Sequence, residues 1–196
     1  MSVMMKLMVK AILRDEQGRI LLLMHKPPRS WLFLPGGRVH YTANDGNSNG
    51  VPVHVEAATA RQMAEQIIGF SVPSVRRESR DRAIRRRLNQ ELVSYGLVDS
   101  ELGKLQMTIQ RKTAPLPHHE IDSHGNPVLY FYVLAVVILA RPTMRQIERR
   151  AAKSECARFV SNDEMKEHLT SDGLPVSTNL YRVLVEAGII KNGTPA

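Results

Sequence analysis

The densest cluster of possible metal ligands in this sequence lies just before a long apolar segment. It combines three imidazoles with two carboxylates, at His118, His119, Glu120, Asp122 and His124. Side chains of these types could bind a divalent metal ion in place of a more regular site. Their spacing matches no defined zinc site, however. The alternative interpretation, which we favour, is a polar hairpin loop exposed to water.

A run of arginines in the middle of the chain is a second group with possible chemistry. Its members are Arg76, Arg77, Arg80, Arg82, Arg85, Arg86 and Arg87. Guanidinium groups bind phosphates through paired hydrogen bonds. Seven arginines spread around a helix cannot all face one ligand, so several must be solvated. A partial phosphate site is the functional alternative.

The charge balance of the whole chain also favours anionic partners. The formal net charge is +8, which suits phosphate-bearing molecules or simply gives a basic solvated surface. Only 5% of the residues are aromatic, so few rings are present to stack on exposed bases. We therefore favour nucleotides or other phosphorylated small molecules as partners, with nucleic acid possible but not favoured.

Cysteine content and hydropathy indicate the compartment. Cys156 is the single cysteine, which excludes an internal disulfide framework and predicts a reducing, cytoplasmic setting. The longest apolar run covers 128–140, whereas a membrane-spanning helix needs about 20 residues. We predict no membrane segment, and we interpret the run as a central strand buried on both faces.

The remaining patterns predict the elements that must position these groups. Strands are expected at 4–13, 19–25, 31–34, 105–111, 128–140 and 156–160. Helices are expected at 55–68, at 79–95 ending at Gly96, at 162–168 capped by Ser161 or Asn162, and up to residue 187 from a cap at Ser177 or Thr178. Residues 41–52 read as a mobile loop. The predicted class is α/β (α+β), a mixed sheet sandwiched between helices.

One stretch links these elements to a known family. The predicted first strand, the turn Asp15-Glu16-Gln17-Gly18, the second strand and the sequence WLFLPGGRV resemble the opening of the Nudix hydrolase superfamily (MutT-like). The family motif is G-x5-E-x7-R-E-U-x-E-E-x-G-U, where U is aliphatic. Its glutamates gather on one face of a helix, where they hold divalent metals that neutralise a pyrophosphate.

In this chain the motif is interrupted and degenerate. Ala43 stands where the family has its first glutamate, and the pattern resumes at Glu78, followed after seven residues by the stretch 86–91. We predict a single Nudix-like domain over 1–196 with an inserted helical segment at about 41–77. A rival alignment places the motif on the earlier helix, with Glu65 between Gln62 and Gln66. We favour the later alignment.

Both alignments retain one glutamate of the metal set. In the favoured alignment Arg87 and Gln90 replace two family glutamates, so the metal candidates are Glu91 and Gln90, and a magnesium or manganese cofactor is weakened by the missing charge. The resemblance also implies a loop carboxylate, Glu120 or Asp122, as a second catalytic candidate in addition to Glu91. The substrate-binding candidates are Trp31, Gly36, Gly37, Arg86 and Arg87.

Two functions follow from the resemblance. The first is a Nudix-type hydrolase acting on a nucleoside diphosphate linked to another group, made weak by the depleted glutamates. The second is a catalytically inactive Nudix fold that binds a phosphorylated ligand or partner. The fold motif favours the first marginally. The arginine at a metal position favours the second, because a cation there can itself pair with phosphate.

Overall fold

The computed structural model describes residues 2–24, 31–39, 41–43, 51–54, 75–77, 79–99, 106–113, 116–121 and 127–191. The strands are β1 (Ser2–Ile12), β2 (Ile20–Met24), β3 (Leu32–Phe33), β4 (Gly36–Arg38), β5 (Tyr41–Ala43), β6 (Val51–His54), β7 (Val75–Arg77), β8 (Met107–Lys112), β9 (Leu116–Ile121), β10 (Pro127–Leu139) and β11 (Ala157–Val160). The helices are α2 (Arg80–Ser94), α3 (Arg141–Ala151), α4 (Asn162–Glu167) and α5 (Leu180–Glu186).

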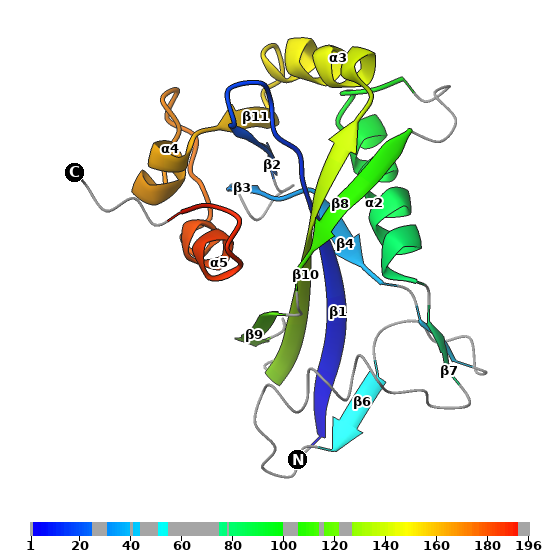
Figure 1. The fold of residues 1–196 in the computed structure, drawn as a ribbon. Helices are drawn as coiled ribbons and strands as arrows, with labels where there is room; N and C mark the ends of the chain where they lie inside the picture. The colour runs from blue at the N-terminus through cyan, green and yellow to red at the C-terminus, as the bar shows by residue number, and fades with distance from the viewer. Residues whose placement is uncertain are drawn as a thin grey trace.

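A pair of long parallel strands forms the axis of the main sheet. β1 and β10 run side by side in register from Met4 opposite Val128 to Ile12 opposite Val136 (Figure 1). β4 and β6 add antiparallel to β1, and β8 and β9 add antiparallel to β10. A second sheet has the order β11-β2-β3, and β5 pairs with β7 in a two-stranded ribbon.

Helices cover the sheets from two sides, with α2 on one side and α4 and α5 on the other (Figure 1). The first apolar core lies under α2 and α3 and includes Leu88, Leu92 and Ile147. The second lies against α4 and α5 and includes Met165 and Leu184. The predicted mixed α+β class, with sheets between helices, is confirmed.

Alternation along the strands explains why one chain segment serves both cores. In β10, Phe131, Val133 and Ala135 belong to the first core, while Leu134 belongs to the second. Successive side chains of a strand point to opposite faces, so a strand with apolar residues at both parities can fill both cores. The prediction of a central strand at 128–140 is confirmed, although Ile138 near its end is half exposed.

The helix predicted at 79–95 is confirmed in type and position. Ser79 caps α2 by accepting a hydrogen bond from the Arg82 amide, and Gly96 follows its end with a φ of 67°. The buried face consists of Ala83, Ile84, Leu88 and Leu92. This helical spacing places a fixed side of α2 against the sheet, which decides where its charged residues lie.

Some predictions need correction, and others stay open. The stretch 41–52 is not all loop, because β5 and β6 begin and end it, and β6 joins the main sheet through β1. Helix α3 was not predicted, and α5 starts after Asn179 without a side-chain cap from Ser177 or Thr178. The helix expected at 55–68 lies outside the described residues, and the insertion at 41–77 stays a prediction.

Candidate functional site

The carboxylate of Glu91 faces the glycine turn at the start of β4. Its Oε2 accepts a hydrogen bond of 2.5 Å from the Gly36 amide. Glu91 lies on the same stripe of α2 as Arg87 one turn earlier and Tyr95 one turn later. The helical spacing and the strand turn thus bring together residues 55 positions apart in the sequence.

The turn can approach the helix because two of its residues lack side chains. Gly36 has a φ of 147°, and a Cβ there would lie 2.1 Å from the Val9 carbonyl oxygen. At Gly37 a Cβ would lie 2.8 Å from both Cδ and Nε of Arg87. The Arg87 side chain therefore occupies the space beside Gly37, next to the Glu91 carboxylate.

A lysine from the central strand completes the charged group. Lys10 lies on β1 opposite Gly36 in register, and its Nζ donates to the Leu34 carbonyl oxygen at 3.2 Å. The same ammonium lies 4.6 Å from the centre of the Phe33 ring, within range of a cation–π interaction. We name Lys10, Gly36, Gly37, Arg87 and Glu91 the glycine-turn site.

The pKa of Glu91 reports the balance of forces in this site. Burial raises it above the ordinary value for glutamate, because a charged carboxylate loses solvation there. The Gly36 amide, Lys10 and Arg87 each oppose that rise. Burial outweighs the three stabilising contacts, so the carboxylate holds its proton more firmly than a solvated glutamate does.

Tyr95 extends the stripe toward the second sheet. Its hydroxyl donates to the Met24 carbonyl oxygen at 2.5 Å. Burial raises the pKa of Tyr95, and the negative charges of Glu91 and Cys156 raise it further. The phenol therefore stays protonated and acts as a hydrogen-bond donor that ties the end of α2 to β2.

The sequence-predicted candidates divide into two groups. Glu91, Arg87, Gly36 and Gly37 meet in the glycine-turn site. Gln90 is exposed, and its side-chain oxygen accepts a hydrogen bond of 3.4 Å from Arg86. This contact joins Gln90 and Arg86 to each other and not to Glu91.

Two further candidates, Trp31 and Glu120, come from the position before β3 and from β9. Trp31 is 39% exposed, and the adjacent Leu32 is held by backbone bonds to Pro175 and Ser177. Glu120 is on β9, which Figure 1 places on the other side of the β1–β10 pair from α2. His118, His119 and Glu120 lie in strand β9 and not in the predicted loop. Their side chains lie outside the described ones, so a metal site in the histidine-rich cluster stays a prediction.

Five of the seven arginines lie on α2 and spread around it as predicted, whereas Arg76 and Arg77 lie in strand β7 and not on a helix. Arg85 donates to the Met107 carbonyl oxygen at 2.8 Å, Arg86 turns to Gln90, and Arg87 lies against Gly37. Arg82 is exposed on the same helix. One arginine of α2 therefore enters the glycine-turn site, while its neighbours serve other contacts.

Sequence reasoning did not select Lys10. It is the single lysine in the mostly buried apolar stretch Leu7–Leu13, which covers the second half of β1 and the residue after it. Long charged side chains are rarely buried without a partner. That interruption, opposite the glycine pair, was the signal that could have pointed to it.

A divalent cation does not fit the residues of this site. One Glu91 oxygen already accepts the Gly36 amide, and two cationic side chains raise the local potential. Magnesium and manganese require several anionic or carbonyl oxygens. Within the part of the chain that the structure describes, no three histidine, cysteine, aspartate or glutamate residues gather in a group that could hold a metal.

Similarities to known proteins are found among solved structures. No family model matches the sequence, and no curated protein matches it. The solution structure of the E. coli ORF135 protein gives a TM-score of 0.43 at 14% identity, over 99% of this chain and 96% of that one. A MutT protein from Methanosarcina mazei Go1 gives 0.41 at 12%, over 95% of each chain.

A Nudix hydrolase from Nitrosomonas europaea gives a TM-score of 0.40 at 15% identity, over 97% of this chain and 99% of that one. The MutT and Nudix proteins carry the names of the family that the sequence motif resembles. The function proposed below rests on the contacts of Glu91 and Arg87. Among the described residues, no helix is long and apolar enough to cross a membrane.

Proposed function

We propose that this chain is a Nudix-like domain that binds a phosphorylated small molecule and hydrolyses it slowly or not at all. The ligand class is a nucleoside diphosphate, free or linked to another group. The observation that carries the proposal is the position of Arg87. It lies beside Gly37 and one helical turn from Glu91, where the family motif would place a metal-binding glutamate.

A guanidinium at this position suits phosphate better than it suits a metal ion. It repels a divalent cation, and its five N–H donors can keep a protein contact while binding phosphate oxygens. Lys10 adds a second positive charge near the same carboxylate. Two cations against one glutamate leave a net positive site, which favours a diphosphate over a bound metal.

Hydrolysis remains a second candidate because of the raised pKa of Glu91. A carboxyl group whose pKa is shifted toward neutrality can accept or donate a proton in catalysis. The missing carboxylates count against an efficient reaction, because removal of one group that stabilises developing charge costs roughly 100- to 1,000-fold in rate. We therefore expect turnover to be slow in this chain.

The first test measures binding without added metal. Calorimetric titration with ADP, pyrophosphate and AMP should show binding that survives EDTA. Arg87→Ala should weaken it about 10-fold or more, because a hydrogen bond to a charged group contributes about 1.5 kcal/mol or more. Arg82→Ala, an exposed arginine on the same helix, is the matched control and should bind like the parent chain.

The second test distinguishes binding from catalysis. Hydrolysis of ADP derivatives should be slow with magnesium or manganese, and Arg87→Glu combined with Gln90→Glu should raise manganese affinity by restoring carboxylates to the helix. Fast metal-dependent turnover in the parent chain that is lost in Glu91→Gln would establish the hydrolase instead. Absence of ligand binding in both tests would remove the proposed function.

A further inference from the structure

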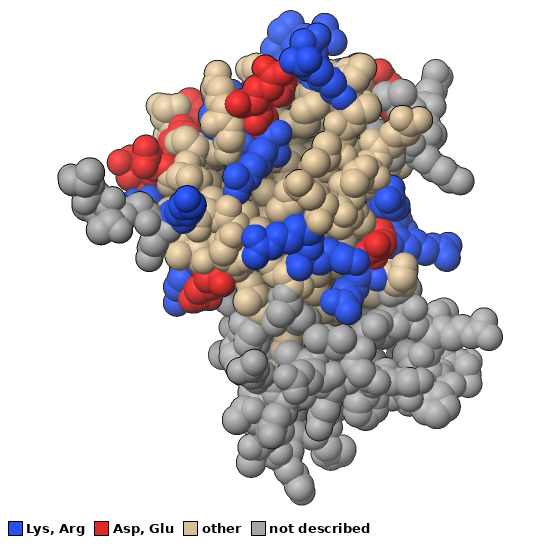
Figure 2. Space-filling model, in the orientation of Figure 1, with Lys and Arg blue, Asp and Glu red and all other residues tan. Residues whose placement is uncertain are grey.

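The outer face of α3 is strongly basic. The segment 141–153 contains five arginine or lysine residues and one glutamate. Ile147 and Ala151 are buried under the helix, so its opposite face is fixed toward solvent. Figure 2 shows a group of basic side chains at the end of the molecule where Figure 1 places α3.

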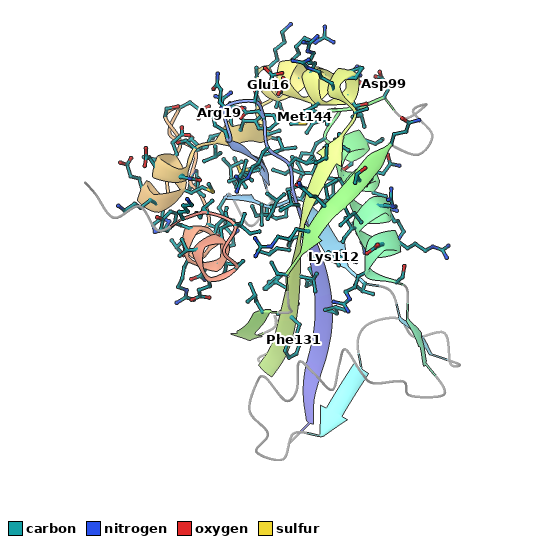
Figure 3. All side chains as sticks on the ribbon, viewed as in Figure 1. Glu16, Arg19, Asp99, Lys112, Phe131 and Met144 are labelled. Carbon is teal, nitrogen blue, oxygen red and sulfur yellow. The ribbon has the colours of Figure 1, made fainter. Side chains whose placement is uncertain are left out.

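Two of these arginines form ion pairs with residues outside the helix. Arg141 pairs with Glu16 at 3.1 Å, and Arg150 pairs with Asp99 at 2.6 Å while it also bonds the Gly96 carbonyl oxygen. Figure 3 labels both carboxylates beside α3. Asp99 also accepts from Gln146 at 2.8 Å, and the pKa of Asp99 is lowered by its bonds to Arg150 and Gln146.

Three further basic residues lie on the outer face of α3 or in the turn directly after it. Arg145, Arg149 and Lys153 are exposed, and none forms an ion pair with another described residue. Arg149 donates to the Arg145 carbonyl oxygen, a contact that leaves its charge uncompensated. We name these three residues the α3 stripe. The nearby acidic groups are Glu148, half-buried on the same helix, and the exposed Glu155.

We propose that the α3 stripe binds the phosphate backbone of nucleic acid. Arg145 and Arg149 are one turn apart, about 6 Å along the helix axis, and Lys153 is four residues further on, in the turn after α3. A nucleic-acid strand carries one phosphate per roughly 3.4 Å of axis, so the stripe spans about three or four phosphates. This surface is independent of the phosphorylated-ligand site proposed above.

The chemistry of α3 favours a polymer of phosphates over a lipid surface. A helix that binds within a membrane interface needs an exposed apolar face, whereas Ile147 and Ala151 of α3 are committed to the core. Backbone contacts carry no sequence information. We therefore expect binding that is independent of sequence and sensitive to salt.

The test compares two triple variants with the same net charge. In one, Arg145, Arg149 and Lys153 are replaced by Gln, and in the other, Arg82, Lys166 and Lys191, which are exposed elsewhere. Binding of a fluorescent mixed-sequence 20-base-pair DNA and of a single-stranded RNA is measured from low to moderate salt. The α3 stripe variant should lose about 10-fold or more in affinity at low salt. The slope of log affinity against log salt concentration should fall in magnitude by about 2 to 3. This is the change expected for three lost phosphate contacts, because each contributes roughly 0.7 to 0.9 to the slope.

The control variant should bind nearly as the parent chain does. Equal losses in both triple variants would mean that total charge acts without a defined surface, and the proposal would be wrong. No binding of either nucleic acid by the parent chain would also overturn it. Binding to anionic phosphatidylserine vesicles in its place would assign the stripe to a lipid partner and overturn it too. Titration with ADP, unchanged in the α3 stripe variant, keeps this result separate from the glycine-turn site.

Discussion

At Gly36 the backbone and its neighbours leave no room for a side chain. Its φ of 147° lies in a region that L residues rarely adopt, and a Cβ would meet two backbone atoms, the Val9 oxygen at 2.1 Å and the Lys10 Cα at 2.8 Å. Backbone atoms cannot turn aside as a flexible side chain can. The amide that binds Glu91 is therefore available only while this residue is glycine.

We predict that Gly36→Ala lowers the free energy of unfolding by about 3 kcal/mol or more, because strain and a backbone clash act together. Chemical denaturation measures it. Gly18→Ala is the matched control, since Gly18 also has a positive φ but a Cβ there meets nothing within 4 Å. That variant should cost about 1 kcal/mol. Equal costs for the two variants would show that the contact with β1 is unimportant.

Glu91 makes stability depend on pH with a defined sign. Burial raises the folded pKa of Glu91 above the ordinary value for glutamate. Its contribution to stability is therefore present below the unfolded pKa and is lost as pH rises through the folded pKa. We predict that the stability difference between the parent chain and Glu91→Gln declines as pH increases through this window. Urea unfolding at a series of pH values measures it.

Glu164 provides the comparison of opposite sign. Burial alone would raise its pKa, but hydrogen bonds from Ser161 and Ser171 outweigh burial and hold the pKa below the ordinary value. Its contribution is present above the unfolded pKa and is lost as pH falls through the folded one. The difference between the parent chain and Glu164→Gln should therefore rise with pH. A Glu91 profile of the same direction would contradict the burial of its carboxylate.

The sequence was sufficient to find four of the five residues of the glycine-turn site. Glu91, Arg87 and the glycine pair could be predicted because their spacing resembles a known motif. Lys10 could not, since its role depends on the pairing of β1 with β4, and that pairing is a property of the fold. Gln90 is adjacent to Glu91 in sequence, but successive helical residues are about 100° apart and point in different directions.

At the scale of elements, α4 is short and depends on its first turn. The Ser161 hydroxyl accepts a hydrogen bond from the Glu164 amide, and the Glu164 carboxylate accepts one from the Ser161 amide, so the two residues form a capping box. The same carboxylate accepts from the Ser171 amide at 2.7 Å. The cap therefore holds both α4 and the turn that follows it.

We predict that Ser161→Ala destabilises the protein by about 1 kcal/mol, the usual effect of removing an N-cap. Asn179→Ala is the control, because Asn179 occupies the N-cap of α5 without a side-chain bond, and its effect should be smaller. Thermal or urea unfolding gives both values. A larger loss for Asn179→Ala would show that the hydrogen bonds of the capping box contribute little.

Local signals determined which elements were predictable. Helix α2 has a cap, four buried residues at helical spacing and a terminal glycine, so its limits followed from the sequence. Helix α3 has Pro142 in its first turn but no side-chain cap, and only Ile147 and Ala151 of its residues are fully buried. The start of strand β6 was interpreted as loop from its composition. Its strand conformation depends on pairing with β1, which the composition does not reveal.

At the scale of the whole molecule, the two cores share their strands. In β2, Leu21 and Leu23 belong to the first core, and Ile20 and Leu22 belong to the second. Neither core can lose this strand without exposing residues of the other. Coupling of this kind favours a single cooperative transition.

We predict coincident unfolding curves from fluorescence and circular dichroism. The single tryptophan, Trp31, adjoins Leu32 of the second core, whereas circular dichroism reports all elements. Leu88→Ala in the first core and Leu184→Ala in the second should each shift both curves together, at a cost of about 2–5 kcal/mol. Separate transitions for the two probes would show that the cores unfold independently.

The parallel pairing of β1 with β10 has a consequence during synthesis. Met4 is opposite Val128, so 128 − 4 = 124 residues separate the two partners. At roughly 5–20 residues per second, β1 is synthesised about 6 to 25 s before its partner residues in β10. During that interval its apolar side chains, Leu7 and Val9 among them, lack their final partner. We expect the nascent chain to depend on protection of this one strand until translation has passed residue 136.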